Sequence, residues 1–436
     1  MGFGLHYSLK EVDVTYCTNI FPYLDAISRS TARRLFIILV GIMVVIDHVK
    51  KYSLYRHGDR SPIKAYPTDP YQESAWPQGF GQLSQEGMQQ HFELGQFLRK
   101  RYTGFLSELY MRYEIAVRST DYDRTLMSAE ANLAGLYPPN SSQAFHPGLK
   151  WQPIPVHTVP QSLERLLSFP LPNCPRYQQL MNMTEKTKIF LNVTRTYEDF
   201  MNMVRKNTGL DTVSIETVWR IYDTLFCEGK HGMVHPPWVT PEVMKTLSLL
   251  KNFCFQMMFG IYKREEKCRL QGGLLLDQII KNFTVAAALN STEKLKMIMY
   301  SAHDTTIVAL QEALAVFNGH NLSLTSFSSS FRSFAVEMYY RNDSSVAEPY
   351  PISLPGCTQR CPLQDFIRLT SSVIPKNWMK ECQITASFSD KDVVIGLAVC
   401  GSVLLLLVVL LLIVLCRQSE PAVGYTHVSN HSDDHS

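Results

Sequence analysis

Short apolar runs alternate with longer amphipathic segments along most of the chain. Runs typical of strands lie at residues 52–55, 114–117, 297–300 and 334–339. Apolar positions at helical spacing predict helices at 84–102, 274–289 and 305–317, and another through Leu126, Ala129 and Leu133. Strands that alternate with helices indicate an α/β domain, so we expect a mixed central sheet flanked by helices.

The pattern changes between residues 160 and 269. Strand signals are scarce there, and helical patterns dominate around 198–206, 214–226 and 241–263. We interpret residues 160–269 as a smaller inserted α-helical domain, which divides the α/β domain into residues 51–159 and 270–385. Ahead of the insertion, a Pro-rich stretch includes an apolar segment at 151–156 that predicts an edge strand.

The most uniform apolar run lies near the C-terminus. Residues 393–416 include no charged side chain, and Leu and Val predominate. A helix that rises about 1.5 Å per residue would cross a bilayer of roughly 30 Å over this length, so the run predicts a transmembrane helix. Arg417 follows at once and favours a cytoplasmic tail at 417–436, which predicts a single-pass type I membrane protein.

A shorter apolar run, residues 35–46, lies near the N-terminus. Arg29, Arg33 and Arg34 precede it, which is typical of the basic region and hydrophobic core of a signal peptide. Residues 1–50 are therefore predicted to be an atypical targeting region. The stretch ahead of the run is long and no small-x-small cleavage site follows, so an uncleaved signal anchor is the competing interpretation.

Composition agrees with a secretory glycoprotein. The net charge of +3 and the absence of a dense Lys/Arg stripe predict no nucleic-acid partner. Sequons, which mark candidate glycosylation sites, occur at Asn140, Asn182, Asn192, Asn282, Asn290, Asn321 and Asn342.

Of the ten cysteines, seven lie in the predicted lumenal part, so at least one thiol should be unpaired there. The cysteines do not form two close pairs, and we predict no metal site.

Candidate chemistry gathers in loops that follow predicted strands. Residues 56–62 read Arg-His-Gly-Asp-Arg-Ser-Pro, and the other two loops are 118–121 and 301–304. Because ligands bind beyond the carboxyl ends of strands in α/β sheets, these three loops could converge. Each loop alone is more often a solvated turn or a helix cap, so the combination carries the weight.

Together the loops suit the hydrolysis of a phosphate monoester. Arg56, Arg60 and Arg118 supply fixed positive charge without a metal or other cofactor. His57 is a plausible nucleophile, provided that it is neutral when it attacks phosphorus.

Two further residues complete this chemistry. His303 is expected to donate to a phosphate oxygen, and Asp304 to protonate the departing alkoxide and later to deprotonate water. Because nearby arginines lower the pKa of an aspartate, Asp304 would act as an acid mainly at low pH, in an acidic compartment.

These residues resemble the motifs of the histidine acid phosphatase family. Residues 56–62 match its RHGxRxP motif, His303-Asp304 matches its HD motif, and the likeness extends from about residue 55 to 382. The resemblance implies an α/β domain with a smaller helical domain and no cofactor. It also implies site roles: nucleophile for His57, proton donor for Asp304, and phosphate binding for Arg56, Arg60, Arg118 and His303.

The resemblance extends to assembly and location. It implies a homodimer whose contact segment includes Trp151 and His157, and disulfides Cys174–Cys382 and Cys357–Cys361. The single span resembles the membrane-anchored lysosomal members rather than the secreted ones, which predicts a lysosomal membrane and lumen location. In the tail, Tyr425 and Val428 resemble a tyrosine-based signal for a sorting adaptor.

Two segments depart from the family pattern. Residues 321–332 lack the cysteine and the Glu-Leu-Tyr strand that the family has after the HD motif, which removes the partner of Cys227 and a sheet strand. Residues 4–51 replace the usual short signal and part of the strand before Arg56. Two alternatives therefore stay open: a phytase- or lipid-phosphate-type histidine phosphatase, or a membrane glycoprotein impaired in catalysis by the altered 319–332 segment.

Overall fold

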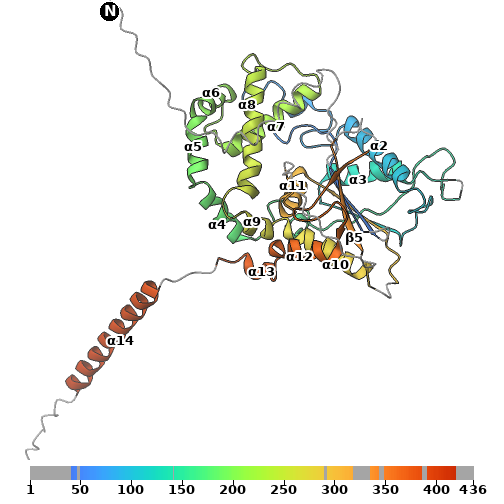
Figure 1. The fold of residues 1–436 in the computed structure, drawn as a ribbon. Helices are drawn as coiled ribbons and strands as arrows, with labels where there is room; N and C mark the ends of the chain where they lie inside the picture. Colours follow the sequence, from blue (N-terminus) through green and yellow to red (C-terminus); the bar gives the residue numbers. More distant parts are fainter. Residues whose placement is uncertain are drawn as a thin grey trace, which may run out of the picture. The chain divides into compact units, whose positions relative to one another are not determined.

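The computed structural model describes residues 41–46, 50–140, 142–288, 292–317, 334–342, 348–384 and 390–418. The chain forms two units, with the boundary between Gln383 and Ile384. A mixed sheet with helices makes up the first unit, and a single long helix makes up most of the described part of the second (Figure 1).

Within the described residues, the sheet has seven strands in the order β3-β4-β2-β1-β5-β6, with β7 paired to β5. The neighbours β3, β4 and β2 run parallel, whereas β1 is antiparallel to both β2 and β5. The mixed sheet that the sequence predicts is thus confirmed. The strands are β1 (Gly41–Ile46), β2 (Lys50–Arg56), β3 (Ile115–Ser119), β4 (Met297–Ala302), β5 (Ala335–Arg341), β6 (Tyr350–Ile352) and β7 (Cys361–Pro362).

The register of the parallel strands brings their carboxyl ends together. Arg56 of β2 lies opposite Ala302 of β4, and Ser301 of β4 lies opposite Ser119 of β3. Every residue of β4 is buried, as expected for an interior parallel strand covered on both faces. The three predicted loops therefore start at one edge of the sheet.

Helices cover both faces of this sheet because alternate strand residues point to opposite sides. Tyr52 and Leu54 of β2 pack in the cluster that includes α10 (Gly273–Ala286), α11 (Asp304–Ala313) and α12 (Leu363–Thr370). Tyr55 packs on the other face, in the cluster with α2 (Gln85–Arg101) and α3 (Asp123–Leu136). The helices α2 and α3 approach so closely that a Cβ at Gly95 would lie 2.0 Å from the carbonyl oxygen of Asn132, so only glycine fits there.

A second group of helices surrounds its own hydrophobic cluster. These are α4 (Pro175–Thr184), α5 (Lys188–Thr196), α6 (Glu198–Thr208), α7 (Ile215–Lys230), α8 (Pro241–Phe255) and α9 (Arg264–Leu270). Helices α6, α7 and α8 confirm the helical patterns in this part of the sequence, and α8 ends at Phe255, where a π-helical turn follows. The division of the first unit into an α/β domain and an inserted helical domain stays a prediction.

Strand β1 differs from the prediction for the N-terminal apolar run. The last six residues of that run, Gly41–Ile46, form a strand inside the sheet, between β2 and β5. An apolar run of this length fits a buried strand as well as the core of a targeting segment, and periodicity cannot separate the two. The strand satisfies the backbone donors and acceptors that β2 and β5 would otherwise leave unpaired.

The edge strand predicted at residues 151–156 is absent from the sheet. This segment is irregular, and the contact nearest to a strand is an isolated bridge between Arg118 and His157. Pro153 and Pro155 lack the backbone N–H that a ladder requires, which explains why no strand forms.

The second unit includes α14 (Asp390–Gln418). Among the described residues it is the one helix long and apolar enough to cross a membrane, over Leu397–Arg417, with a mean hydropathy of 3.3. In the first unit, disulfides join Cys174 to Cys382 and Cys357 to Cys361, the pairing that the family resemblance implies. Cys227 is buried and free.

Candidate active site

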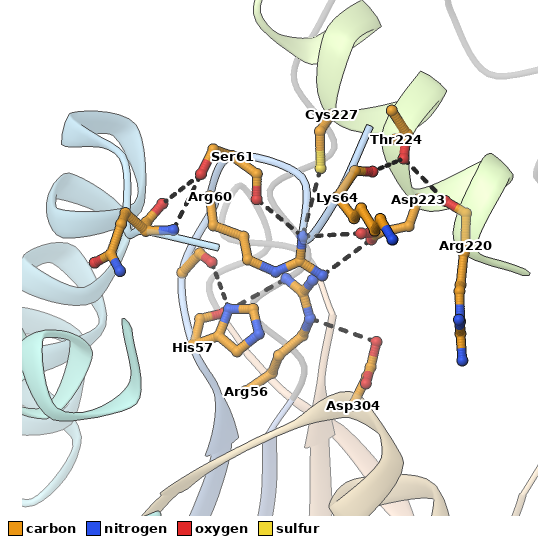
Figure 2. Close-up of polar contacts among 12 residues, drawn as sticks. Arg56, His57, Arg60, Ser61, Lys64, Arg220, Asp223, Thr224, Cys227 and Asp304 are labelled. Atoms are coloured by element: carbon orange, nitrogen blue, oxygen red, sulfur yellow. Dashed lines mark hydrogen bonds and ion pairs between the residues drawn. The ribbon is translucent and has the colours of Figure 1, made fainter. Parts of the chain in front are cut away.

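The site lies where the loops after β2, β3 and β4 meet the helix α7. Figure 2 shows Arg56, His57 and Arg60 on one side, Asp304 at the start of α11, and Asp223 on α7. The backbone N–H of His57 donates to the carbonyl of Ala302 over 3.0 Å, which ties the first loop to the third. The predicted convergence of the loops at residues 56–62 and 301–304 is therefore observed.

His57 is held as a neutral imidazole with one free nitrogen. Its side chain is buried, and Nδ1 lies 2.8 Å from the carbonyl oxygen of Gly58, which can only accept, so Nδ1 carries the proton and Nε2 keeps its lone pair. Burial, together with the charges of Arg56 and Arg60, lowers the pKa of His57 well below its ordinary value. The ring therefore stays uncharged at acid pH, as a nucleophile requires.

Gly58 lets this loop approach α2. A Cβ at Gly58 would lie 2.4 Å from the carbonyl oxygen of Gly87, a contact that no side chain tolerates. The Gly58 N–H donates to Ser128 Oγ of α3 over 3.1 Å. The glycine thus fixes the position of the residue before it, His57.

Asp304 is the first residue of α11, and its Oδ2 lies 3.7 Å from Arg56 Nε. Its Oδ1 accepts the backbone N–H of Thr305 over 2.8 Å. Burial favours the neutral acid, but the charges of Arg56 and Arg60 outweigh it and lower the pKa of Asp304 below its ordinary value. The site therefore holds an ionised carboxylate beside the arginines.

His303 closes the side of the site formed by the loop after β3. Its Nε2 lies 3.0 Å from Thr120 Oγ1, and its ring meets that of Tyr122 edge to face with centroids 5.1 Å apart. Burial, followed by the charge of Arg124, lowers the pKa of His303 to about 3. The rings of His303 and His57 have centroids 5.6 Å apart, so both imidazoles face the same small space.

Arg60 is anchored by the helical group. Its Nη1 and Nη2 each donate to a carboxylate oxygen of Asp223 over 3.0 Å. Nη1 also donates to the carbonyl of Ser61 over 3.0 Å and lies 3.7 Å from Cys227 Sγ (Figure 2). No sequence pattern points to Asp223, because a single aspartate within a helical pattern is usually a solvated residue.

Arg118 is engaged elsewhere. Its Nη2 donates to both carboxylate oxygens of Glu164, over 2.8 and 2.9 Å, and the Glu164 side chain is 1% exposed. The arginines with the largest effects on the pKa of His57 and His303 are Arg56, Arg60 and Arg124. The structure thus does not group Arg118 with the other predicted site residues.

Arg124 is the arginine on this side of the site whose charge acts on His57 and His303. It is the second residue of α3, and its guanidinium lies over the ring of Tyr122, 4.7 Å from the centroid. Burial, followed by the charge of Arg60, lowers the pKa of Arg124 to about 10, and its buried Nε has no hydrogen-bond partner in the ranges that the structure describes. The sequence offers one signal for a role of Arg124. A positive charge in the first turn of a helix interacts unfavourably with the helix dipole, so an arginine at this position favours a functional explanation.

A cavity of about 260 Å³ adjoins the site. It shares Tyr122 and Arg124 with the site, and its lining includes the side chains of Ile63, Phe80 and Gln161. A cavity of this size and mixed polarity suits a small organic group attached to the phosphate.

The other predicted residues lie away from this site or outside the described residues. Asn290 and Asn321, together with the tail residues Tyr425 and Val428, lie outside the described residues. Of the remaining sequons, Asn282 is half-buried, and four asparagines are exposed: Asn140, Asn182, Asn192 and Asn342.

Known proteins resemble this chain over most of its length. Residues 52–336 match the model of the histidine phosphatase superfamily (branch 2). The chain is 57% identical over 409 residues to lysosomal acid phosphatase of Homo sapiens, covering 91% of this chain and 96% of the relative. It is 47% identical over 340 residues to prostatic acid phosphatase of Homo sapiens, covering 77% and 87%.

Solved structures share the fold. The phytase of Citrobacter braakii superposes with a TM-score of 0.52 at 19% identity, covering 78% of this chain and 99% of that chain. The apo form of the Hafnia alvei phytase gives a TM-score of 0.51 at 16% identity, covering 81% and 100%. At these identities the likeness supports the fold alone.

Proposed function

The chain belongs to the histidine phosphatase superfamily (branch 2), and on this premise we propose that it is an acid phosphatase that hydrolyses phosphate monoesters through a phosphohistidine on His57. The observation that carries the proposal is a buried, neutral imidazole whose free Nε2 lies among arginines, with a carboxylate at the start of α11. The lysosomal and prostatic acid phosphatases that the chain resembles agree with this activity.

Binding rests on the arginines. The guanidinium groups of Arg56, Arg60 and Arg124 attract the phosphate and neutralise the charge that develops on its oxygens in the transition state. Their mutual repulsion, which is part of what lowers the pKa of Arg124, is relieved when an anion binds among them. A phosphate is therefore a favourable occupant of this space.

The first chemical step forms the phosphohistidine. The Nε2 lone pair of His57 attacks phosphorus, the N–P bond forms, and the P–O bond to the ester group breaks. Asp304 gives its proton to the departing oxygen, so the product leaves as a neutral alcohol. The cavity beside Tyr122 and Arg124 is suited to the organic part of that alcohol.

The second step regenerates the enzyme. The Asp304 carboxylate, now ionised, accepts a proton from water as the water oxygen attacks phosphorus. The N–P bond breaks, inorganic phosphate leaves, and Asp304 is protonated again. One carboxyl group thus serves both steps without any further proton carrier.

The pH dependence follows from the proton on Asp304. Arg56 and Arg60 keep the pKa of this carboxyl low, but a bound phosphate offsets their charge and raises that pKa. A phosphate monoester carries its second proton below about pH 6, so at acid pH the substrate delivers the proton that Asp304 needs. Activity should therefore fall as the pH rises above roughly 6.

The location of the enzyme follows from its relatives and from α14. Together they indicate a lysosomal, membrane-anchored protein. We propose a type I orientation, with the first unit in the lumen and residues 417–436 in the cytoplasm, where Tyr425 and Val428 would bind a sorting adaptor. Protease protection in sealed vesicles, with an antibody against the tail, tests this orientation.

Two surface features support further parts of the proposal. Trp151 and His157 are exposed, as residues of a homodimer contact would be in a single chain, and sedimentation of the lumenal part tests the dimer. The exposed sequons are suited to glycans, which mass spectrometry of the secreted lumenal part would detect.

The activity itself is tested with a series of aryl and alkyl phosphates between pH 4 and pH 8. We expect hydrolysis of both classes with a maximum at acid pH, and loss of turnover in His57→Ala. A folded protein without hydrolysis of any phosphate monoester would contradict the proposal and would favour a catalytically impaired glycoprotein.

A further inference from the structure

Arg60 has two edges that can donate hydrogen bonds, and the protein occupies one of them. A guanidinium offers an end-on pair of donors, Nη1 and Nη2, and a side-on pair, Nε and Nη2. The end-on pair is taken by Asp223, which accepts from Nη1 at Oδ2 and from Nη2 at Oδ1, both over 3.0 Å. Nη1 gives its remaining hydrogen bond to the carbonyl of Ser61.

The side-on edge is left open. The Nε of Arg60 is buried and has no hydrogen-bond partner within the described part of the chain, although an unpaired buried donor is costly. Nη2 donates to Asp223 alone among the described residues, which leaves its second hydrogen on the same edge as Nε–H. These two parallel donors match the geometry of two phosphate oxygens.

Asp223 is itself held in place by its neighbours on α7. The next residue, Thr224, donates from Oγ1 to the carbonyl of Lys64 over 2.8 Å, so α7 is tied to the loop that contains Arg60 (Figure 2). Thr224 is 2% exposed and Arg60 is 8% exposed, which leaves little freedom for either side chain. The bidentate contact therefore joins two segments that are already fixed.

Charge alone does not explain a carboxylate at this position. A negative group beside an anion site repels the phosphate that the site must bind. The neighbouring Cys227 thiol does not compensate, because burial, followed by the charge of Asp223, raises its pKa to about 12 and keeps it neutral. A role in orientation accounts for the aspartate where a role in attraction does not.

We propose that Asp223 is a positioning residue for phosphate binding. It accepts hydrogen bonds from the end-on edge of Arg60 and thereby orients the side-on edge, Nε–H and Nη2–H, toward the phosphate. The inference rests on the proposed phosphatase activity and adds to it a role for the helical group. Asp223 touches no reacting atom, and it acts through Arg60.

The first test is a pair of substitutions, Asp223→Ala and Asp223→Asn, with kcat and KM for an aryl phosphate and the inhibition constant for inorganic phosphate. Loss of a bidentate charged contact should raise KM and the inhibition constant about tenfold or more in Asp223→Ala, with a smaller change in kcat. Asp223→Asn keeps one hydrogen-bond acceptor, so its KM and inhibition constant should lie between those of the wild type and those of Asp223→Ala. Unchanged constants for both variants in a folded protein would overturn the proposal.

The second test is a double-mutant cycle with Arg60→Ala. If Asp223 acts only through Arg60, Asp223→Ala should have no further effect on KM in the Arg60→Ala background. An effect of equal size in both backgrounds would assign Asp223 a merely structural role. Glu164→Gln, which weakens the ion pair with Arg118, is the matched control and should leave the inhibition constant for phosphate unchanged.

Labelling separates this inference from the activity on which it rests. Asp223→Ala should still form a phosphoenzyme on His57 at saturating substrate. If the wild-type protein forms none while it turns over, the proposed function fails; if it does, and the constants of Asp223→Ala match those of the wild type, only the inference about Asp223 fails.

Discussion

The site has two walls that differ in origin and in task. The sheet wall supplies the predicted nucleophile His57, the predicted phosphate-binding residue His303 and the predicted proton donor Asp304 from loops that directly follow β2 and β4. The helix wall, α7, supplies Asp223 and Cys227, which touch Arg60 and none of the reacting atoms. The residues proposed to react thus lie on the sheet wall, where strand register sets their positions. The helix wall orients the guanidinium of Arg60.

The largest loss is expected on the sheet wall, at His57. His57→Ala removes the nucleophile and should lower kcat/KM by about 10⁴-fold or more, since covalent catalysis has no substitute in the site. Steady-state kinetics with an aryl phosphate measure this. His146→Ala, an exposed histidine, is the control and should behave as the wild type. Equal activity of both variants would remove His57 from the mechanism.

Asp304→Asn should have the next largest effect, and the effect should depend on the leaving group. An alkyl alcohol needs a proton as it departs, so kcat/KM for alkyl phosphates should fall about 10²–10⁴-fold. A nitrophenolate leaves without a proton, so the same constant for nitrophenyl phosphate should fall much less. Equal losses for the two substrates would exclude Asp304 as the proton donor.

Arg124 and Arg118 are expected to respond differently to substitution by alanine. Arg124→Ala should lower kcat/KM by about 10²–10³-fold, because the positive charge faces the reacting histidines. Arg118→Ala should leave kcat/KM of the folded protein nearly unchanged and lower its free energy of unfolding by roughly 1–3 kcal/mol, since Glu164 stays buried without its partner. Kinetics and thermal unfolding of both variants decide between them, and the reverse ranking would restore Arg118 to the site.

The choice between these two arginines shows the limit of prediction from the sequence. The motif at residues 56–62 and the pair His303-Asp304 follow strands whose apolar runs are clear, so their convergence could be predicted. Arg118 and Arg124 lie only six positions apart, Arg118 within the strand β3 and Arg124 in the first turn of the helix α3. The proposal that Arg124 and not Arg118 binds the phosphate depends on the ion pair between Arg118 and Glu164. These two residues are 46 positions apart in the sequence, so no local pattern reveals their contact.

The strand β1 shows a second limit. Its apolar residues satisfy the pattern of a targeting segment and the pattern of a buried strand equally well. Its place between β2 and β5 depends on the hydrogen-bonding needs of strands almost 300 residues apart, which no local pattern records. Asp223 was missed for the same reason, because its partner Arg60 lies 163 residues away.

The smallest expected effect is on the melting temperature, and it arises where a loop packs against the helix α7. Asp69, in the loop ahead of residues 73–75, and Glu228 of α7 are both buried acids, and neither Glu228 oxygen has a hydrogen-bond partner among the described residues. Burial, followed by the charge of Asp69, raises the pKa of Glu228 to about 8.

The sign of the pH effect follows. Between the unfolded pKa of about 4.5 and the folded value of about 8, the folded protein holds a proton that the unfolded chain has lost, so this stability is complete below about pH 4.5, falls as the pH rises between the two values and is lost above about 8. Glu228→Gln donates at every pH, so its melting temperature should change less between pH 5 and pH 8 than that of the wild type, by roughly 3–10 °C. Parallel curves for the two proteins would show that the pair shares no proton.

The central claim is that phosphate is transferred to His57 before it reaches water. Rapid mixing with a radiolabelled aryl phosphate, an alkaline denaturing quench and peptide mapping by mass spectrometry test it directly, because phosphohistidine survives base and is lost in acid. We predict an acid-labile label on the peptide that includes His57, increased in Asp304→Asn and absent in His57→Ala. A label on another residue, or turnover without any labelled intermediate, would contradict the account.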